Sequence, residues 1–93
     1  KVLTAFEPLF ASYRNLIPSH QFKLLQAIAV EDGISKPTSG EFIKKHDLTT
    51  ASSVTPSLKA LAEKEMIVRE GNLWLVYDVF FARWLEYHYG KQV

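Results

Sequence analysis

The pattern of apolar and polar positions changes its period within residues 48–78. Small polar residues open this stretch, and apolar residues then recur at spacings of three and four over residues 51–64, as on one face of a helix. Two short runs of alternating apolar and polar residues follow, separated by Gly71-Asn72, and this arrangement predicts two strands joined by a tight turn. The stretch therefore predicts a helix that leads directly into a β-hairpin.

Apolar residues at helical spacing also begin the chain, over residues 2–16, but Pro8 interrupts them. A proline costs about 3 kcal/mol inside a helix and is tolerated in its first turn. Two interpretations follow: the helix begins near Glu7, or a longer helix kinks at Pro8. We favour the start near Glu7, with residues 2–6 as an irregular lead-in or the tail of a preceding element.

Two more amphipathic segments lie between this first helix and the stretch described above. Ser19 is the expected N-cap of the first of them, which should end near Glu31 because an Asp-Gly pair follows. Thr38 or Ser39 should cap the second, which ends at the basic residues 44–46. We expect these two helices to form a helix-turn-helix core together with the longer helix that leads into the hairpin.

Pro56 lies too deep in the helix of residues 51–64 to be well tolerated, so we expect that helix to have an irregular or shifted first turn. Beyond the hairpin, aromatic and apolar residues at helical spacing predict a last helix over residues 79–89. Gly90 is the natural C-cap of this helix.

The order of these elements predicts the fold. Three helices followed by a hairpin are typical of a winged helix-turn-helix, here with an additional helix at each end. We therefore predict a mostly α fold with a small β-hairpin in a single domain: a linking helix over residues 1–16, a winged-helix core over residues 19–78 and a C-terminal helix over residues 79–89. Because the chain opens with Lys1 inside an apolar-periodic pattern, we expect it to be a fragment of a longer protein.

Composition removes several classes of function. The 93 residues contain no cysteine, which excludes disulfides, thiol chemistry and a cysteine-based zinc site. The three histidines, His20, His46 and His88, lack the spacing of metal ligands, so we expect no metal. No apolar run approaches the roughly 18 residues of a membrane span and no signal-peptide pattern is present, so we expect a cytoplasmic protein without a membrane partner.

The sequence also lacks the motifs of an enzyme. It contains no Ser-His-Asp constellation in a recognisable context, no paired carboxylates in a known motif and no GxxxxGK[ST] loop for phosphates. We therefore expect a non-catalytic module without a cofactor of its own.

Four phrases between residues 19 and 85 are similar to a known group: QFKLLQAIA, KPTSGEFIKKHDL, ASSVTPSLKALAEKEMI and VYDVFFARWL. In this combination the chain resembles the C-terminal winged-helix domain of a prokaryotic AAA-type ATPase, of the archaeal ATPase kind. The resemblance implies an accessory domain of a protein whose ATP and magnesium site lies in a domain upstream. It also implies contact with double-stranded DNA, with the ATPase domain of the same protein, or with another protein such as a second copy in a homo-oligomer.

In winged helices the helix after the turn enters the major groove of DNA, and its outer residues meet base edges and phosphates. The residues expected on this helix and on the wing as DNA contacts are Ser52, Ser53, Thr55, Ser57, Lys59, Arg69 and Asn72. Residues 38–72 contain five basic and five acidic side chains, so non-specific attraction to phosphates should be weak. The alternative is that these residues form a helix cap and an ordinary solvated face.

Seven of the twelve aromatic residues lie within residues 74–89. They either close the core against Phe6, Phe10 and Tyr13 of the first helix or leave an apolar patch for a partner. The core interpretation is favoured for Trp74, Phe80, Phe81 and Trp84. The candidates for partner contact are Phe81, Trp84, Tyr87 and Tyr89, of which the last two, near the end of the chain, suit that role better. DNA contact and protein contact thus remain the two hypotheses for function.

Overall fold

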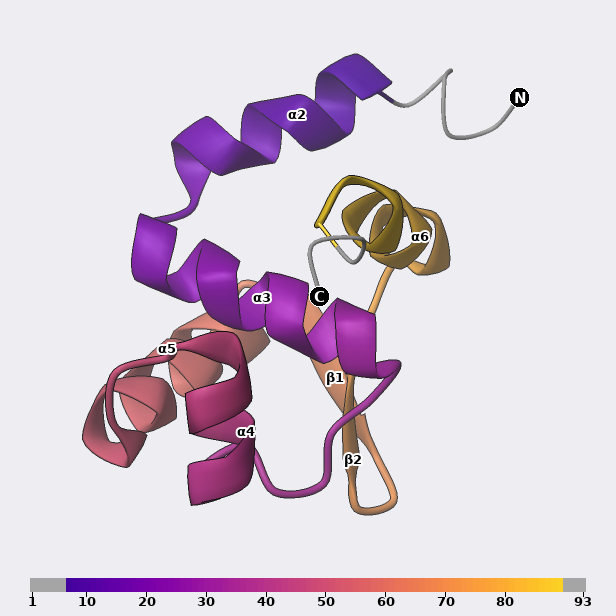
Figure 1. The fold of residues 1–93 in the computed structure, drawn as a ribbon. Coiled ribbons are helices and arrows are strands. Elements are labelled where there is room, and N and C mark those ends of the chain that lie inside the picture. Colours follow the sequence, from indigo (N-terminus) through magenta and orange to yellow (C-terminus); the bar gives the residue numbers. More distant parts are fainter. Residues whose placement is uncertain (1–6, 90–93) are drawn as a thin grey trace.

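The computed structural model describes residues 7–89, which form five helices and one two-stranded antiparallel sheet (Figure 1). In chain order these elements are α2 (Glu7–Leu16), α3 (Ser19–Glu31), α4 (Gly40–His46), α5 (Ala51–Glu63), β1 (Ile67–Glu70), β2 (Leu73–Val76) and α6 (Val79–Tyr89). This order confirms the predicted mostly α fold with a hairpin and an additional helix at each end. Three expectations lie outside the described residues: the lead-in of residues 2–6, the contact of Phe6 with the aromatic cluster, and Gly90 as a C-cap.

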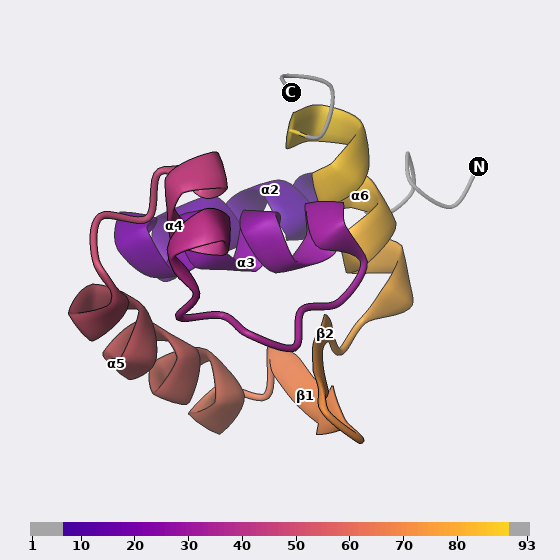
Figure 2. The ribbon, with the colours of Figure 1, turned by 60° about the horizontal axis from the view of Figure 1, so that its bottom comes forward.

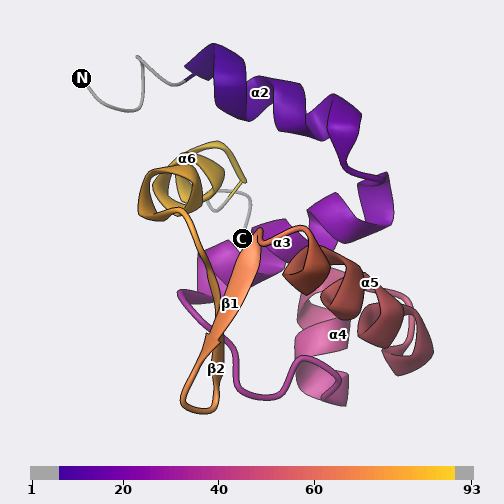
Figure 3. The same cartoon turned by 180° about the vertical axis from the view of Figure 1, so that it is seen from behind.

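α3 lies at the centre of the fold. Figures 1 and 3 show α2 and α6 on one side of α3, and α4, α5 and the hairpin on the other. The most buried large residues of α3 are Leu24, Leu25 and Ile28, which are at most 1% exposed. Burying an aliphatic side chain of this size stabilises a fold by about 1.5–3 kcal/mol. α3 is therefore the common packing partner of the elements on both sides.

The two ends of α3 are held by different means. Ser19 is the first residue of the helix, so the prediction that it is the N-cap is wrong. Pro18 takes the cap position with φ −52° and ψ 145°, and its carbonyl accepts from the Phe22 N–H at 2.9 Å. The other end follows the prediction: Asp32 is left-handed, with φ 55°, and its N–H donates to the Ala29 carbonyl at 3.1 Å.

The hairpin has one face turned to the core. Its register pairs Ile67 with Val76, and both residues are buried. Gly71 and Asn72 form the expected two-residue turn between the strands, and Gly71 adopts a φ of 63°. A φ of this sign suits glycine, which has no β-carbon to clash with the backbone.

Ile34 adds a short bridge to the free side of β2. The backbones of Ile34 and Trp74 exchange two hydrogen bonds, of 3.0 and 2.8 Å. Gly33 precedes the bridge with φ 110°, and a β-carbon at this position would lie 2.8 Å from Cδ2 of Leu75. Glycine is therefore favoured at position 33 by the backbone conformation, and a β-carbon there would also force the end of the Leu75 side chain to move. The bridge ties the end of α3 to β2.

α2 and α6 pack together through aromatic side chains. The ring centre of Phe10 lies 5.2 Å from that of Phe81 and 5.9 Å from that of Trp84, and all three residues are at most 3% exposed. The indole N–H of Trp84 donates to Oε1 of Glu7 at 2.8 Å. Asp78 holds the start of α6, because its carboxylate accepts from two backbone N–H groups in the first turn.

Replacing Phe81 with alanine should lower the free energy of unfolding by about 3–5 kcal/mol, because the substitution leaves a cavity where α2 meets α6. The neighbouring Phe80 is 49% exposed. Phe80→Ala should therefore cost about 1 kcal/mol or less. Urea unfolding followed by circular dichroism measures both variants, and equal losses would contradict this placement of the core.

Candidate functional site

The turn between α4 and α5 determines where α5 begins. Asp47 ends α4 in a left-handed conformation, with φ 54°, and Leu48 is buried in the core. Thr50 then caps α5: its hydroxyl accepts from the Ser53 N–H at 3.2 Å, and the Ser53 hydroxyl accepts from the Thr50 N–H at 3.4 Å. This reciprocal capping box and the buried Leu48 hold the first turn of α5 in place.

Pro56 lies inside α5, and the expectation of an irregular or shifted first turn is wrong. The helix begins at Ala51 and continues through Pro56. A proline removes the hydrogen bond to the carbonyl four residues earlier, which here belongs to Ser52. Both Ser52 and Pro56 are exposed, so water can reach that carbonyl. The Thr55 hydroxyl also donates to the Ala51 carbonyl at 3.3 Å, which adds a bond to the same turn.

Three of the predicted DNA-contact residues form an exposed stripe along α5: Ser52, Thr55 and Lys59. Their spacings of three and four residues place them on one face of the helix, and we call them the α5 stripe. Ser53 is half-buried, and its hydroxyl takes part in the cap. Ser57 is only 3% exposed, and its hydroxyl donates to the Ser53 carbonyl at 3.1 Å. The prediction that Ser57 lies on the outer face is therefore wrong, since a serine bonded back to its own helix can face the core.

The two predicted contacts on the wing are exposed. Arg69 belongs to β1 and Asn72 to the turn, and Figure 2 shows α5 running through a short connection into β1. The guanidinium of Arg69 lies 5.6 Å from the ring centre of Trp74 on the neighbouring strand. This cation–π contact holds the Arg69 side chain along the hairpin.

Basic side chains near α5 are partly occupied by other groups. Nζ of Lys23 lies 3.4 Å from the Asp47 carboxylate, and Nζ of Lys64 donates to Oε1 of Gln21 at 2.7 Å. Lys59 is the one basic residue in the α5 stripe. The surface thus offers hydroxyl groups and a single amine, which fits the balanced charge of residues 38–72.

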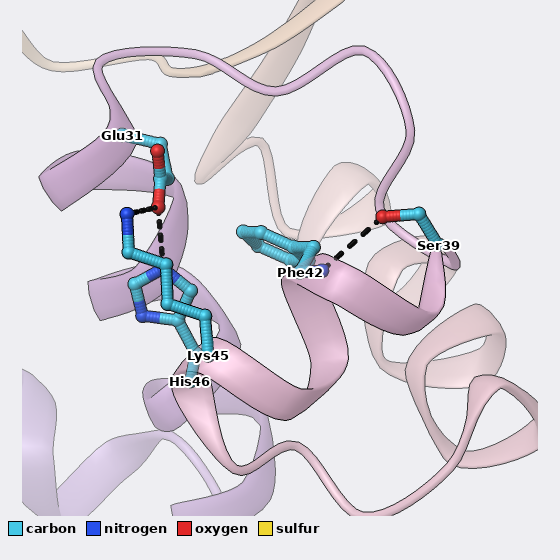
Figure 4. Close-up of polar contacts among 5 residues, drawn as sticks. All are labelled: Glu31, Ser39, Phe42, Lys45 and His46. Carbon is cyan, nitrogen blue, oxygen red and sulfur yellow. Dashed lines mark hydrogen bonds and ion pairs between the residues drawn. The ribbon is translucent and has the colours of Figure 1, made fainter.

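Glu31, at the end of α3, holds α4 in position (Figure 4). Its Oε2 lies 2.7 Å from Nε2 of His46 and 2.9 Å from Nζ of Lys45. The hydrogen bonds from His46 and then Lys45 hold the pKa of the Glu31 carboxyl below its ordinary value of 4.5. At the other end of α4, Ser39 and not Thr38 is the N-cap, and its hydroxyl accepts from the Phe42 N–H at 3.2 Å. α4 is therefore fixed at both ends before the turn into α5.

Glu31→Gln should lower the free energy of unfolding by about 1–2 kcal/mol at neutral pH, since a charged acceptor becomes a neutral one. Folding lowers the pKa of Glu31. The wild type should therefore be more stable than Glu31→Gln at pH values above the unfolded-state pKa. This difference in stability is lost as the pH falls from about 4.5 through the lower pKa of Glu31 in the folded state.

Urea unfolding at neutral and at acidic pH measures this effect. The control is Glu63→Gln at the exposed end of α5, which should change stability by about 0.5 kcal/mol or less. A stability difference between Glu31→Gln and the wild type that persists unchanged in acid would contradict the assignment.

The four aromatic candidates for partner contact divide into two groups. Phe81 and Trp84 are 1% and 3% exposed. The prediction that these two contact a partner is wrong, because α2 packs over them. Tyr89 is partly buried, and its ring centre lies 5.9 Å from that of Phe22. Tyr87 is 59% exposed and stays on the surface.

The hairpin has an apolar outer face that the sequence interpretation missed. Val68 lies opposite Leu75, and Glu70 opposite Leu73, so these four side chains share the face turned away from the core. Tyr77 follows Leu75 by two residues, which places it on the same face, and it is 68% exposed. We call these five residues the hairpin outer face. The signal was present: the residues at positions 73, 75 and 77 are as apolar or aromatic as those at positions 74 and 76.

Exposed apolar residues continue from the hairpin into α6. Val79 and Phe80 are 62% and 49% exposed, and Leu73 and Tyr77 precede them on the hairpin outer face. The remaining large apolar residues with high exposure lie on α2, at Leu9 and Leu16, and at Tyr87. More than half of these residues are therefore gathered at the hairpin and the start of α6.

Three features are absent from the described part of the chain: a metal-binding group, an unpaired buried polar side-chain atom and a membrane-spanning helix. Within residues 7–89 no group of three or more His, Asp or Glu side chains is placed to hold a metal ion. Among the same residues, no buried side-chain nitrogen or oxygen lacks a hydrogen-bond partner. No helix of the described range is long and apolar enough to cross a membrane.

A protein-family model described as "Probable winged helix domain" matches residues 8–87. The match covers most of the chain, so the protein belongs to this winged-helix family, whose domains are typically non-catalytic. Neither the comparison with curated proteins nor the comparison with solved structures found a match. The family membership agrees with the winged-helix part of the resemblance described above.

Proposed function

We propose that this winged-helix domain is a non-catalytic accessory module of a larger prokaryotic AAA-type ATPase, and that it contacts double-stranded DNA through the α5 stripe. The four phrases within residues 19–85 support the AAA-type parent, and the family membership supports a recognition module. In this proposal, ATP and magnesium belong to the ATPase domain of the parent protein, which acts in the cytoplasm.

The observation that supports DNA contact is the α5 stripe. Ser52, Thr55 and Lys59 are exposed on the helix that follows the turn, which winged-helix proteins place in the major groove. Hydroxyl and amine groups can contact phosphates and base edges. Figures 1 and 3 show α2 and α6 on the other side of α3, where they leave α5 accessible.

Duplex DNA should bind weakly, because the stripe contains a single lysine. A dissociation constant on the order of 10–100 µM at about 100 mM salt is typical of largely non-specific contact. Lys59→Ala should weaken binding to all sequences alike and reduce the slope of log affinity against log salt by about 1. Fluorescence anisotropy of a labelled duplex measures both quantities.

The matched control is Arg14→Ala, which removes a positive charge from α2, on the far side of α3. It should leave the slope unchanged. Absence of binding at micromolar protein in low salt would contradict DNA contact, and equal effects of the two variants would contradict the α5 stripe as the contact surface.

Protein contact is the second candidate function, and the hairpin outer face is the observation that favours it. Exposed apolar side chains that adjoin one another mark interaction sites on soluble domains. Leu73 and Tyr77 of the hairpin outer face provide such a group, and Val79 and Phe80 continue it at the start of α6. The partner in this alternative is the ATPase domain, a second copy of the chain or another protein.

A further inference from the structure

We propose that the hairpin outer face is a docking surface for a protein segment whose apolar side chains are flanked by lysine or arginine. The inference rests on the protein-contact alternative above and adds the chemistry of the partner. The surface consists of Val68, Glu70, Leu73, Leu75 and Tyr77, and Val79 at the start of α6 continues it.

The apolar part of the surface borders a hollow. This hollow, of about 290 Å³, lies where the end of α3, the hairpin and the start of α6 meet. Its apolar lining includes Ile28, Val68, Leu75, Tyr77 and Val79. This volume lies just below the range for small-molecule sites, which is about 300–1,000 Å³. The hollow therefore suits one or two apolar side chains of a protein segment.

Tyr77 also borders a second hollow, of about 320 Å³, between the end of α5 and β1. The lining of this hollow includes Ala62, Ile67 and Val68. Tyr77 is largely exposed, and it and Val68 line both hollows, so the two hollows adjoin at these residues. A segment that passes over Tyr77 can place one side chain in each hollow.

Carboxylates surround this apolar surface. Asp32 and Glu70 line the first hollow and Glu65 lines the second, and all three are exposed. Within residues 7–89 none of the three forms an ion pair. Arg83 also lines the first hollow, but its guanidinium is already bonded to Glu86 at 3.0 Å. Among the described residues, the two hollows are thus lined by three carboxylates without an ion pair and by one guanidinium that is already paired, although the whole chain has a net charge of +1.

This charge distribution selects the occupant. A second copy docked face to face would bring the same carboxylates together, and DNA would bring phosphates against them, so both are repelled. A segment with lysine or arginine beside its apolar residues instead gains attraction at the rim and burial in the hollows. The hairpin outer face and the α5 stripe therefore have different partners.

The test is an NMR titration of the ¹⁵N-labelled 93-residue chain with two synthetic amphipathic peptides. One peptide contains only leucine and lysine, and in the other every lysine is replaced by glutamate. The leucine–lysine peptide should shift the amide signals of Val68, Leu75, Tyr77 and Val79. The leucine–glutamate peptide should bind at least about tenfold more weakly.

Two double variants separate the local carboxylates from the total charge. Asp32→Asn with Glu70→Gln should weaken binding of the leucine–lysine peptide about tenfold. Asp47→Asn with Glu41→Gln changes the net charge equally and should weaken it less than about twofold. The second double variant is a close control for the first, because Asp32 and Asp47 are both left-handed C-caps, with φ 55° and 54°. Asparagine also tolerates this conformation.

Each contrary result has its own meaning. If neither peptide shifts these amides, protein contact through this face is overturned. If the leucine–glutamate peptide binds as well as the leucine–lysine peptide, or if the two double variants lose affinity equally, protein contact survives but the basic partner is overturned. Shifts of the same amides by duplex DNA, or self-association that Tyr77→Ser abolishes, would overturn the proposed occupant.

Discussion

The buried residues of α3 hold the helices and the hairpin of this domain together. Leu25 and Ile28 of this helix are fully buried. Figure 1 shows α3 between the terminal helices on one side and α4, α5 and the hairpin on the other. The end of α3 adds polar ties, because Glu31 bonds to α4 and Gly33 leads into the bridge with β2. Every surface proposed to bind a partner is therefore held in place by this one helix.

Element order and several boundaries could be predicted from the sequence because their causes are local. The Asp-Gly pair at positions 32 and 33 ends α3, and Gly71-Asn72 makes the turn of the hairpin, as expected. Ser19 was misplaced because Pro18 can itself take the cap position, with an extended ψ. The local pattern could not settle that choice.

Which side chains are buried was harder to predict, since burial depends on packing between elements that are distant in the sequence. Phe80 and Phe81 are neighbours, yet one is half exposed and the other buried, because α2 covers only one side of α6. Ser57 was predicted on the outer face of α5, but the way that α5 packs on the core turns this residue inward, where it is buried. Pro56 was expected to disturb the first turn of α5. The helix continues through it because the carbonyl that loses its hydrogen bond lies on an exposed turn, where water can reach it.

The two proposed surfaces differ in the chemistry that they offer. The α5 stripe has hydroxyl groups and one amine, and the hairpin outer face has apolar side chains with carboxylates around them. An accessory module with both surfaces can contact DNA and a protein at the same time, because the charge of each surface disfavours the partner of the other.

α3 should join the terminal helices and the winged-helix elements into one cooperative core. Native-state hydrogen exchange measures this directly, because amides that open only by global unfolding share one free energy of exchange. The amides of Ile28 in α3, Leu61 in α5 and Leu85 in α6, all fully buried residues, should exchange with the same free energy, equal to that of global unfolding. Much faster exchange at Leu85 than at Ile28 would show that α6 unfolds separately, and it would contradict the account.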